Sequence, residues 1–357
     1  MGILQGQSTF WRPLLWLAAL GLFVWVLASV PLTDAWASVR KLDAWAVIAL
    51  VAVNLVALVV FGMRWWVILR GLGVPIGLLH AALYRLIAFG FSYFTPGPQI
   101  GGEPVQVLLA EKRHGVLREI AIASVGLDRL FDGVFNLAFV AAAALVVVEA
   151  GAALVLALFV IVPLGYILAL GLGEKPVSAM IRRDVVRASE AQAGRFCRER
   201  PFYLVLAIAA SFASWGVLLF EYWLLAFFLG VSLSASELII GLAAARIAYL
   251  LLFPAGLGVL EAGQVAAVRA LGFPAALGMS LSLVIRFRDV VVASFGLWLG
   301  MRMLTKQEKN NAKSQRRKGA KVRAPNFLCV FAPLRLFFRL LRGPSTSLRC
   351  SSSIAPR

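Results

Sequence analysis

Long apolar segments alternate with short polar ones along this chain, and this pattern predicts membrane-spanning helices. Six apolar segments come close to or exceed the roughly 20 residues that a spanning helix needs: residues 14–32, 44–63, 120–148, 152–172, 202–229 and 277–304. We therefore expect an all-α polytopic membrane protein with about six full transmembrane helices.

Two further apolar segments, 75–111 and 237–271, are interrupted in the middle by Pro and Gly. The first break runs from Phe94 to Glu103 and reads FTPGPQIGGE, and the second runs from Phe253 to Glu261 and reads FPAGLGVLE. Breaks of this kind survive in a bilayer only where they are buried in protein or line a wet cavity. Because their arms are short for full crossings, we predict two re-entrant hairpins; the alternative, in which each arm crosses fully, stays open.

The same residue types surround both breaks in the same order. The first half carries Arg85, Glu103, Gly115, Arg129 and Asp132, and the second carries Arg246, Glu261, Gly272, Arg286 and Asp289. Breaks at corresponding places in two halves are a sequence signature of transporters with a central site. The sequence therefore predicts an internal repeat with halves at about 44–172 and 202–304.

The distribution of positive charge predicts how the chain is oriented. The loop 174–201 contains seven Lys and Arg residues, and residues 306–357 contain thirteen against one acid, Glu308. Cytoplasmic loops are enriched in Lys and Arg, so both regions and both termini are predicted to be cytoplasmic. The two hairpins then enter from opposite faces, as in an inverted repeat.

Composition supports a membrane protein with a basic tail. The 357 residues are 61% hydrophobic, and the tail carries +12 of the net charge of +18. We predict residues 1–305 to be the membrane domain and 306–357 to be a disordered cytoplasmic tail, although Phe327–Leu341 could instead lie on the membrane surface. Ala35-Trp36-Ala37 resembles a signal-peptidase site, so a cleaved first segment is an alternative to an uncleaved helix.

The composition also argues against several other classes of function. A basic surplus on a membrane protein is typical of cytoplasmic loops, so nucleic-acid binding is not expected. The three cysteines and two histidines have no metal-site spacing, and we expect no cofactor.

Ionisable residues within spans are candidates for function. We expect Arg129 and Arg286 to bind phosphate, with Arg85 and Arg246 as second choices. Glu103 and Glu261 are predicted to bind a cationic headgroup or carry a proton. Further candidates are acids, glycines that allow close backbone approach, and polar groove residues: Asp128, Asp132, Asp289, Gly101, Gly102, Pro254, Gly256, Gly258, Gln99, Gln106 and Gln264.

A purely structural alternative is also consistent with the sequence. Arg129 with Asp132, and Arg286 or Arg288 with Asp289, could form ion pairs that only stabilise the bundle. Arg64-Trp65-Trp66, at the end of the second predicted span, is typical of a cytoplasmic interface anchor.

Around both breaks the sequence resembles the flippase-like membrane domain of the lysylphosphatidylglycerol synthase family. The similarity covers about residues 10–304 and rests on two sets of residues: Pro96-Gly97-Pro98, Gly101-Gly102-Glu103 and Asp128-Arg129, then Pro254, Gly256, Gly258, Glu261 and Arg286. In bifunctional members this domain moves an aminoacylated phospholipid between leaflets, and a separate soluble domain synthesises the lipid. The resemblance implies the flippase-like part alone, because nothing after residue 304 is long or apolar enough to be that synthase.

We therefore expect a non-enzymatic flippase of the cell inner or plasma membrane that moves a polar or anionic phospholipid between leaflets. No nucleotide-binding G-x(4)-G-K-[ST] motif occurs in the sequence. Two alternatives remain: an intramembrane lipid-modifying transferase, and a non-transporting membrane subunit of an envelope-lipid pathway.

Overall fold

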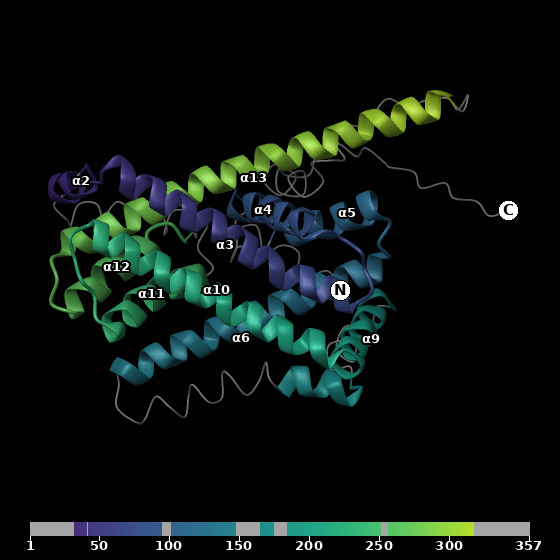
Figure 1. Ribbon diagram of the computed structural model, residues 1–357, viewed down its shortest axis with the longest axis horizontal. Helices are drawn as coiled ribbons and strands as arrows, with labels where there is room; N and C mark the ends of the chain where they lie inside the picture. Colours follow the sequence, from purple (N-terminus) through teal and green to yellow (C-terminus); the bar gives the residue numbers. More distant parts are fainter. Residues whose placement is uncertain are drawn as a thin grey trace, which may run out of the picture. The chain divides into compact units, whose positions relative to one another are not determined.

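The computed structural model describes residues 32–40, 42–94, 101–147, 165–174, 184–250 and 256–317. Every regular element in these ranges is an α-helix (Figure 1): α2 (Leu32–Arg40), α3 (Ala44–Gly71), α4 (Leu78–Phe94), α5 (Glu103–His114), α6 (Arg118–Val147), α9 (Asp184–Glu199), α10 (Pro201–Phe228), α11 (Ala235–Leu250), α12 (Val259–Ala270) and α13 (Ala275–Arg317), together with residues 165–172. Nearly all of the predicted span 14–32 and most of 152–172 lie outside the described residues. The all-helical prediction is confirmed for the part of the chain that the structure describes.

Helices α3 and α10 are the two described helices that are long and apolar enough to cross a membrane. Each has 28 residues and is therefore about 42 Å long at a rise of 1.5 Å per residue. Asp43 caps α3 by accepting a 2.7 Å hydrogen bond from the Ala46 N–H. Much of their apolar surface is exposed, including Trp45, Leu55 and Phe212, as expected of helices that face lipid.

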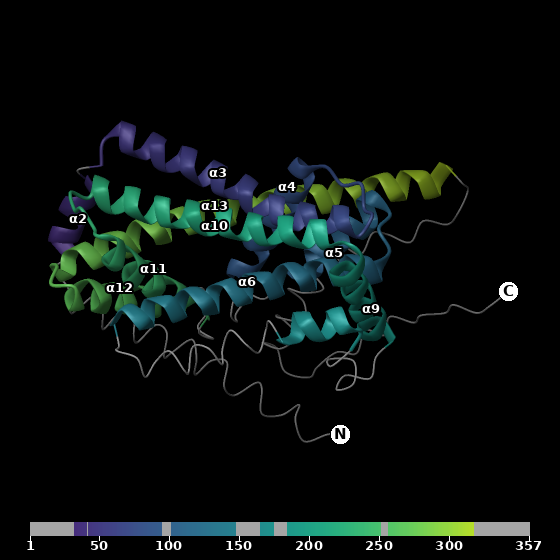
Figure 2. The ribbon, with the colours of Figure 1, turned by 60° about the horizontal axis from the view of Figure 1, so that its bottom comes forward.

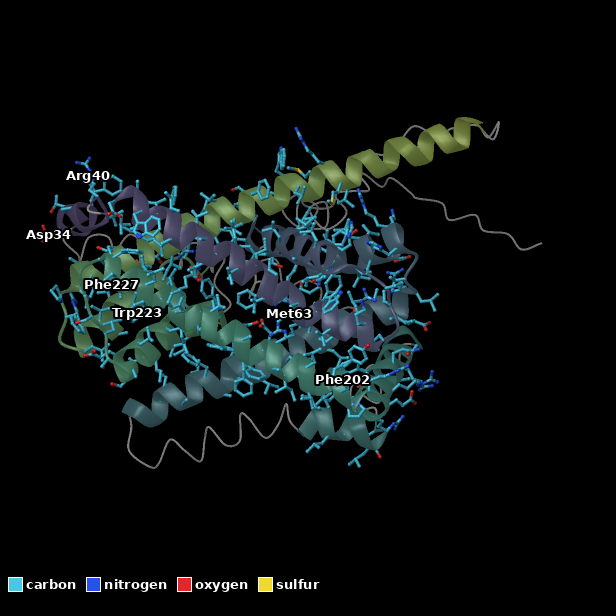
Figure 3. The ribbon with its side chains drawn as sticks, viewed as in Figure 1. Asp34, Arg40, Met63, Phe202, Trp223 and Phe227 are labelled. Atoms are coloured by element: carbon cyan, nitrogen blue, oxygen red, sulfur yellow. The ribbon has the colours of Figure 1, made fainter. Side chains whose placement is uncertain are left out.

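These two helices pack against each other along their length and run in opposite directions. Figures 1 and 2 show them side by side, and they form the most extensive helix pair in the described part of the chain. In Figure 3, Phe202 at the start of α10 and Trp223 and Phe227 near its end mark the direction of that helix, opposite to that of α3. A hydrogen bond between Asn54, in the first half of α3, and Glu221, late in α10, agrees with the antiparallel arrangement.

The two broken segments form pairs of short helices, as their sequences predict. Helices α4 and α5 have 17 and 12 residues, and α11 and α12 have 16 and 12. At 1.5 Å per residue, none of the four reaches the roughly 30 Å of a bilayer core. Within each pair, the two helices pack against each other.

Helices from the two halves pack on each other in a reciprocal way. α4 approaches α13 closely where Gly90 faces Ala293, Gly296 and Leu297, and α11 packs against α6. If the halves correspond as their sequences indicate, α4 matches α11 and α6 matches α13, so each contact is the counterpart of the other. Small residues at such crossings let helix backbones approach closely.

Three details differ from or extend the sequence-based expectations. Arg64 and Trp65 are fully buried rather than lying at an interface, because Trp65 donates to Ser124 at 3.2 Å and Arg64 pairs with acids on α6. The predicted loop 174–201 contains helix α9. Helix α13 continues past residue 304 to Arg317; Leu15–Gly300 form one compact unit, and the helix beyond Gly300 belongs to another.

Candidate functional site

The described end of the first break, Gly101-Gly102-Glu103, is held by hydrogen bonds from its two glycine N–H groups. The N–H of Gly102 donates to the Ser92 hydroxyl at 2.8 Å, and the N–H of Gly101 donates to the Glu103 carboxylate at 2.8 Å. A side chain on Gly102 would collide with the backbone of Ala88 in α4. Glycine is therefore required here for close contact between the break and the helix before it.

A buried ionic cluster lies beside this break and joins three helices. Arg64 on α3 donates to Asp128 at 2.7 Å and to Asp132 at 2.9 Å, and both acids lie on α6. Arg85 on α4 pairs with the other oxygen of Asp128. Because Arg64 and Asp128 are each only 1% exposed, neither charge could stay buried without the other.

Arg129 connects this cluster to the glutamate of the first break. Its Nε lies 3.0 Å from Glu103 Oε1, and its Nη1 lies 3.9 Å from Asp132 on the same helix. The Arg129 side chain is 34% exposed and that of Glu103 is 16% exposed. This pair is therefore more accessible than the Glu261–Arg286 pair at the second break, whose side chains are 1% and 15% exposed.

The second break repeats this arrangement in a more buried setting. Gly256 and Gly258 have φ angles of 64° and 77°, which disfavour residues with a side chain. The Gly258 N–H donates to Glu261 at 2.9 Å, and Arg286 donates to both oxygens of that carboxylate at 2.8 to 3.1 Å. Arg286 also donates to the Gly256 carbonyl at 3.1 Å and to the Tyr93 hydroxyl, near the first break, at 3.4 Å.

Each break therefore has the same set of contacts. Its glutamate accepts a hydrogen bond from an N–H of its own break and lies within 3.0 Å of the arginine that follows it in sequence by about twenty-five residues. Tyr93 and Arg286 bring the end of α4, directly before the first break, to the second break.

A second ionic network joins helices α3, α10, α11 and α13. Arg288 pairs with Glu221 and with Asp289 at 2.7 Å. Asn54 donates to Glu221 at 3.0 Å, and the Tyr249 hydroxyl donates to Asp289 at 2.5 Å. Helix α3 belongs to the first predicted half and the other three to the second, so the network connects the two halves in the interior of the bundle.

Arg246 on α11 has a different environment. Its guanidinium carbon lies 5.4 Å from the ring centre of Trp215, and its Nε is buried without a hydrogen-bond partner among the described residues. It lines a cavity of about 30 Å³ between α10, α11 and α13, together with Leu218, Glu221, Tyr222, Leu225, Leu242, Ala245, Tyr249, Ile285 and Arg288.

The two glutamines that follow the break glutamates by three residues are both buried. Gln264 accepts a 2.7 Å hydrogen bond from Tyr222, whereas neither polar atom of the Gln106 side chain has a partner among the described residues. The structure thus places both inside the bundle beside their breaks. The predicted site residues Gln99 and Pro254 lie outside the described residues.

Arg64, Glu221 and Arg288 belong to these networks but were not among the predicted site residues. Glu221 had a detectable signal, since it is a lone acid in an otherwise apolar span. Arg64 could not have been found from sequence, because an arginine beside two tryptophans near a span end is equally typical of an interface. Among the described residues, no three His, Cys, Asp or Glu side chains are arranged to hold a metal ion.

The two networks, the glutamate–arginine pairs and Arg246 together contain equal numbers of opposite charges. The six arginines are Arg64, Arg85, Arg129, Arg246, Arg286 and Arg288, and the six acids are Glu103, Asp128, Asp132, Glu221, Glu261 and Asp289. Balanced, hydrogen-bonded charge is a condition for burying so many ions in an apolar setting.

Comparison with known proteins agrees with a membrane location and a lipid-related function. An archaeal protein from Methanothermobacter thermautotrophicus, described as a UPF0104 membrane protein, is 30% identical over 95 residues, which cover 27% of this chain and 28% of the relative. No solved structure matches the chain. The lysylphosphatidylglycerol synthase TM region matches residues 14–296, which include both breaks and both networks. The chain therefore belongs to the lysylphosphatidylglycerol synthase TM-region family.

Proposed function

We propose that this protein is a lipid flippase that moves a polar or anionic phospholipid between the leaflets of the cell membrane, without changing the lipid covalently. The observation that carries the proposal is the repeated contact set at the two breaks, in which a glutamate is held by its own break and by an arginine. Family membership adds the link to membrane lipids.

We further propose that the two halves form an inverted repeat of re-entrant hairpins, with both termini in the cytoplasm. The antiparallel α3–α10 pair and the reciprocal α4–α13 and α6–α11 contacts support this arrangement. Alternating access in such folds uses corresponding elements of the two halves in turn.

The difference in exposure between the two glutamate–arginine pairs fits one step of such a cycle. Arg129 is 34% exposed and Arg286 is 15% exposed, while Glu103 is 16% and Glu261 is 1% exposed. A lipid phosphate would compete with the glutamate for the guanidinium, because both offer two oxygens to it. The first break would then be accessible while the second is closed, and the roles would exchange during transport.

Leaflet exchange in proteoliposomes tests this function. Purified full-length protein is reconstituted into vesicles that contain a headgroup-labelled phosphatidylglycerol, and transfer between leaflets is followed by accessibility of the label. We expect exchange well above that of protein-free vesicles, and its loss in a Glu103→Gln plus Glu261→Gln variant that remains monodisperse. Arg269→Gln, an exposed change near the end of α12, is the matched control.

Two results would contradict the proposal. Unchanged exchange in the double glutamine variant would remove the role of the repeated glutamates. A covalently altered lipid recovered from the vesicles would favour the transferase alternative instead.

A further inference from the structure

The two halves differ at the residue that could pair with the arginine before each break, Arg85 in the first half and Arg246 in the second. In the first half, Arg85 pairs with Asp128, which directly precedes Arg129 in sequence. The residue directly before Arg286 in the second half is Ile285. The second half therefore has an apolar side chain where the first has the counter-ion.

Arg246, the counterpart of Arg85, lacks a carboxylate partner as a result. Within the described part of the chain no acid lies within 4.0 Å of its guanidinium, whereas each of the other five arginines of the networks has one. The Trp215 ring lies 5.4 Å from its guanidinium carbon. A cation–π contact uses the charge of a guanidinium without accepting its N–H hydrogen bonds.

The cavity that Arg246 lines has few other free donors. The hydroxyl of Tyr222 donates to Gln264, that of Tyr249 donates to Asp289, and Arg288 is held by Glu221 and Asp289. Ile285, which takes the sequence position of Asp128 in the second half, lines the same cavity. At about 30 Å³, the space is close to the volume of one water molecule in the liquid, so it takes one or two oxygens of a phosphate group and not a whole lipid headgroup.

Building on the proposed function, we infer that this cavity is a binding site for a phosphate-type oxyanion, with Arg246 as its principal ligand. A guanidinium offers parallel N–H donors to two oxygens of one phosphate group. The oxyanion takes the place in the second half that the Asp128 carboxylate occupies in the first.

The charge around the cavity sets which oxyanion fits best. Glu221 and Asp289 both pair with Arg288, and Arg246 adds a single positive charge that no carboxylate of the described residues contacts, so there is no surplus of positive charge to attract a dianion. A singly charged phosphodiester, as in a phospholipid headgroup, is therefore favoured over inorganic phosphate, part of which is a dianion near pH 7.

The test measures binding to the purified full-length protein in detergent micelles. Titration calorimetry with dihexanoyl phosphatidylglycerol and, separately, with inorganic phosphate distinguishes a lipid headgroup from a free anion. We expect Arg246→Gln to weaken binding of the lipid by at least about tenfold, as for loss of hydrogen bonds to a charged group. Arg269→Gln removes an exposed positive charge elsewhere and should leave binding unchanged.

A second variant tests the same site without removing Arg246, so that a loss of binding can be distinguished from a loss of folding. Ile285→Asp gives Arg246 the partner that Arg85 has, so it should abolish lipid binding while the thermal midpoint stays the same or rises. Equal affinity of the wild type, Arg246→Gln and Ile285→Asp would overturn the inference. Tighter binding of inorganic phosphate than of the lipid would overturn the preference for a phosphodiester.

The binding measurement and the exchange measurement test the two proposals independently. Leaflet exchange that persists in a protein with no measurable binding at Arg246 would remove the cavity site and leave the proposed function standing. Binding that depends on Arg246 in a protein that does not exchange lipid would do the reverse.

Discussion

Arg286 donates three hydrogen bonds to the carboxylate of Glu261, at 2.8, 3.0 and 3.1 Å. Glu261 is 1% exposed, so the carboxylate depends on this one arginine and on the Gly258 N–H. The pair fixes the second break to α13. The same relationship in the first half, between Arg129 and Glu103, has a single close contact and more exposure.

Loss of the buried arginine should destabilise the protein more than loss of the accessible one. We expect Arg286→Ala to cost about 3–5 kcal/mol, because it leaves Glu261 buried without its partner. Arg129→Ala should cost about 1 kcal/mol or less, since its pair is partly screened by solvent. Thermal unfolding of both variants in the same detergent compares them, and an equal loss in the two would contradict the difference in burial.

Arg64 is predicted to be essential for folding, although its position in the sequence resembles an interface anchor. It is hydrogen-bonded to both Asp128 and Asp132, and Arg64→Met would leave two acids short of a partner in the interior. We expect little folded protein from Arg64→Met in a size-exclusion assay of membrane extracts. Arg70→Met, at an exposed site in the last turn of the same helix, is the control, and normal yield of Arg64→Met would refute the prediction.

The close approach at the first break should make Gly102→Ala strongly destabilising. The added methyl group would meet the Ala88 backbone, which cannot move without displacing α4. Gly126→Ala on α6 is the matched control, because nothing lies within 4 Å of its added carbon and alanine favours a helix by roughly 1 kcal/mol. Thermal midpoints should therefore shift in opposite directions, and a shift of the same sign in both would count against the packing at Gly102.

Cys197 on α9 should react slowly with alkylating reagents at neutral pH. Burial raises the pKa of this thiol to about 11, so the reactive thiolate is scarce at pH 7.5 and increases as the pH rises toward that value. In a variant with Cys329 and Cys350 replaced by serine, we expect iodoacetamide labelling on the order of 100-fold slower than for an unperturbed thiol. Arg195→Cys, at an exposed position of the same helix, serves as the reference. Equal labelling rates at the two cysteines would exclude the raised pKa of Cys197.

The sequence determined the helical class and the locations of the two breaks, because backbone in a bilayer must satisfy its own hydrogen bonds and long apolar runs leave few alternatives. It also identified the glutamates and arginines around the breaks, since an ionisable residue in an apolar run stands out. The pairing of each break glutamate with its arginine was not predicted; the ion pairs considered from sequence were those within one helix, such as Arg129 with Asp132.

Only the tertiary structure decided which charges are satisfied and which are not. Arg64 and Trp65 lie in the interior because α3 packs against α6. Glu221 on α10 contacts Asn54 on α3 and Arg288 on α13, which are far from it in the sequence. Whether Arg246 has a counter-ion depends on which side chain α13 presents to it. Spacing along one helix constrains neighbours within a few residues, whereas contacts between helices depend on how all of them pack together.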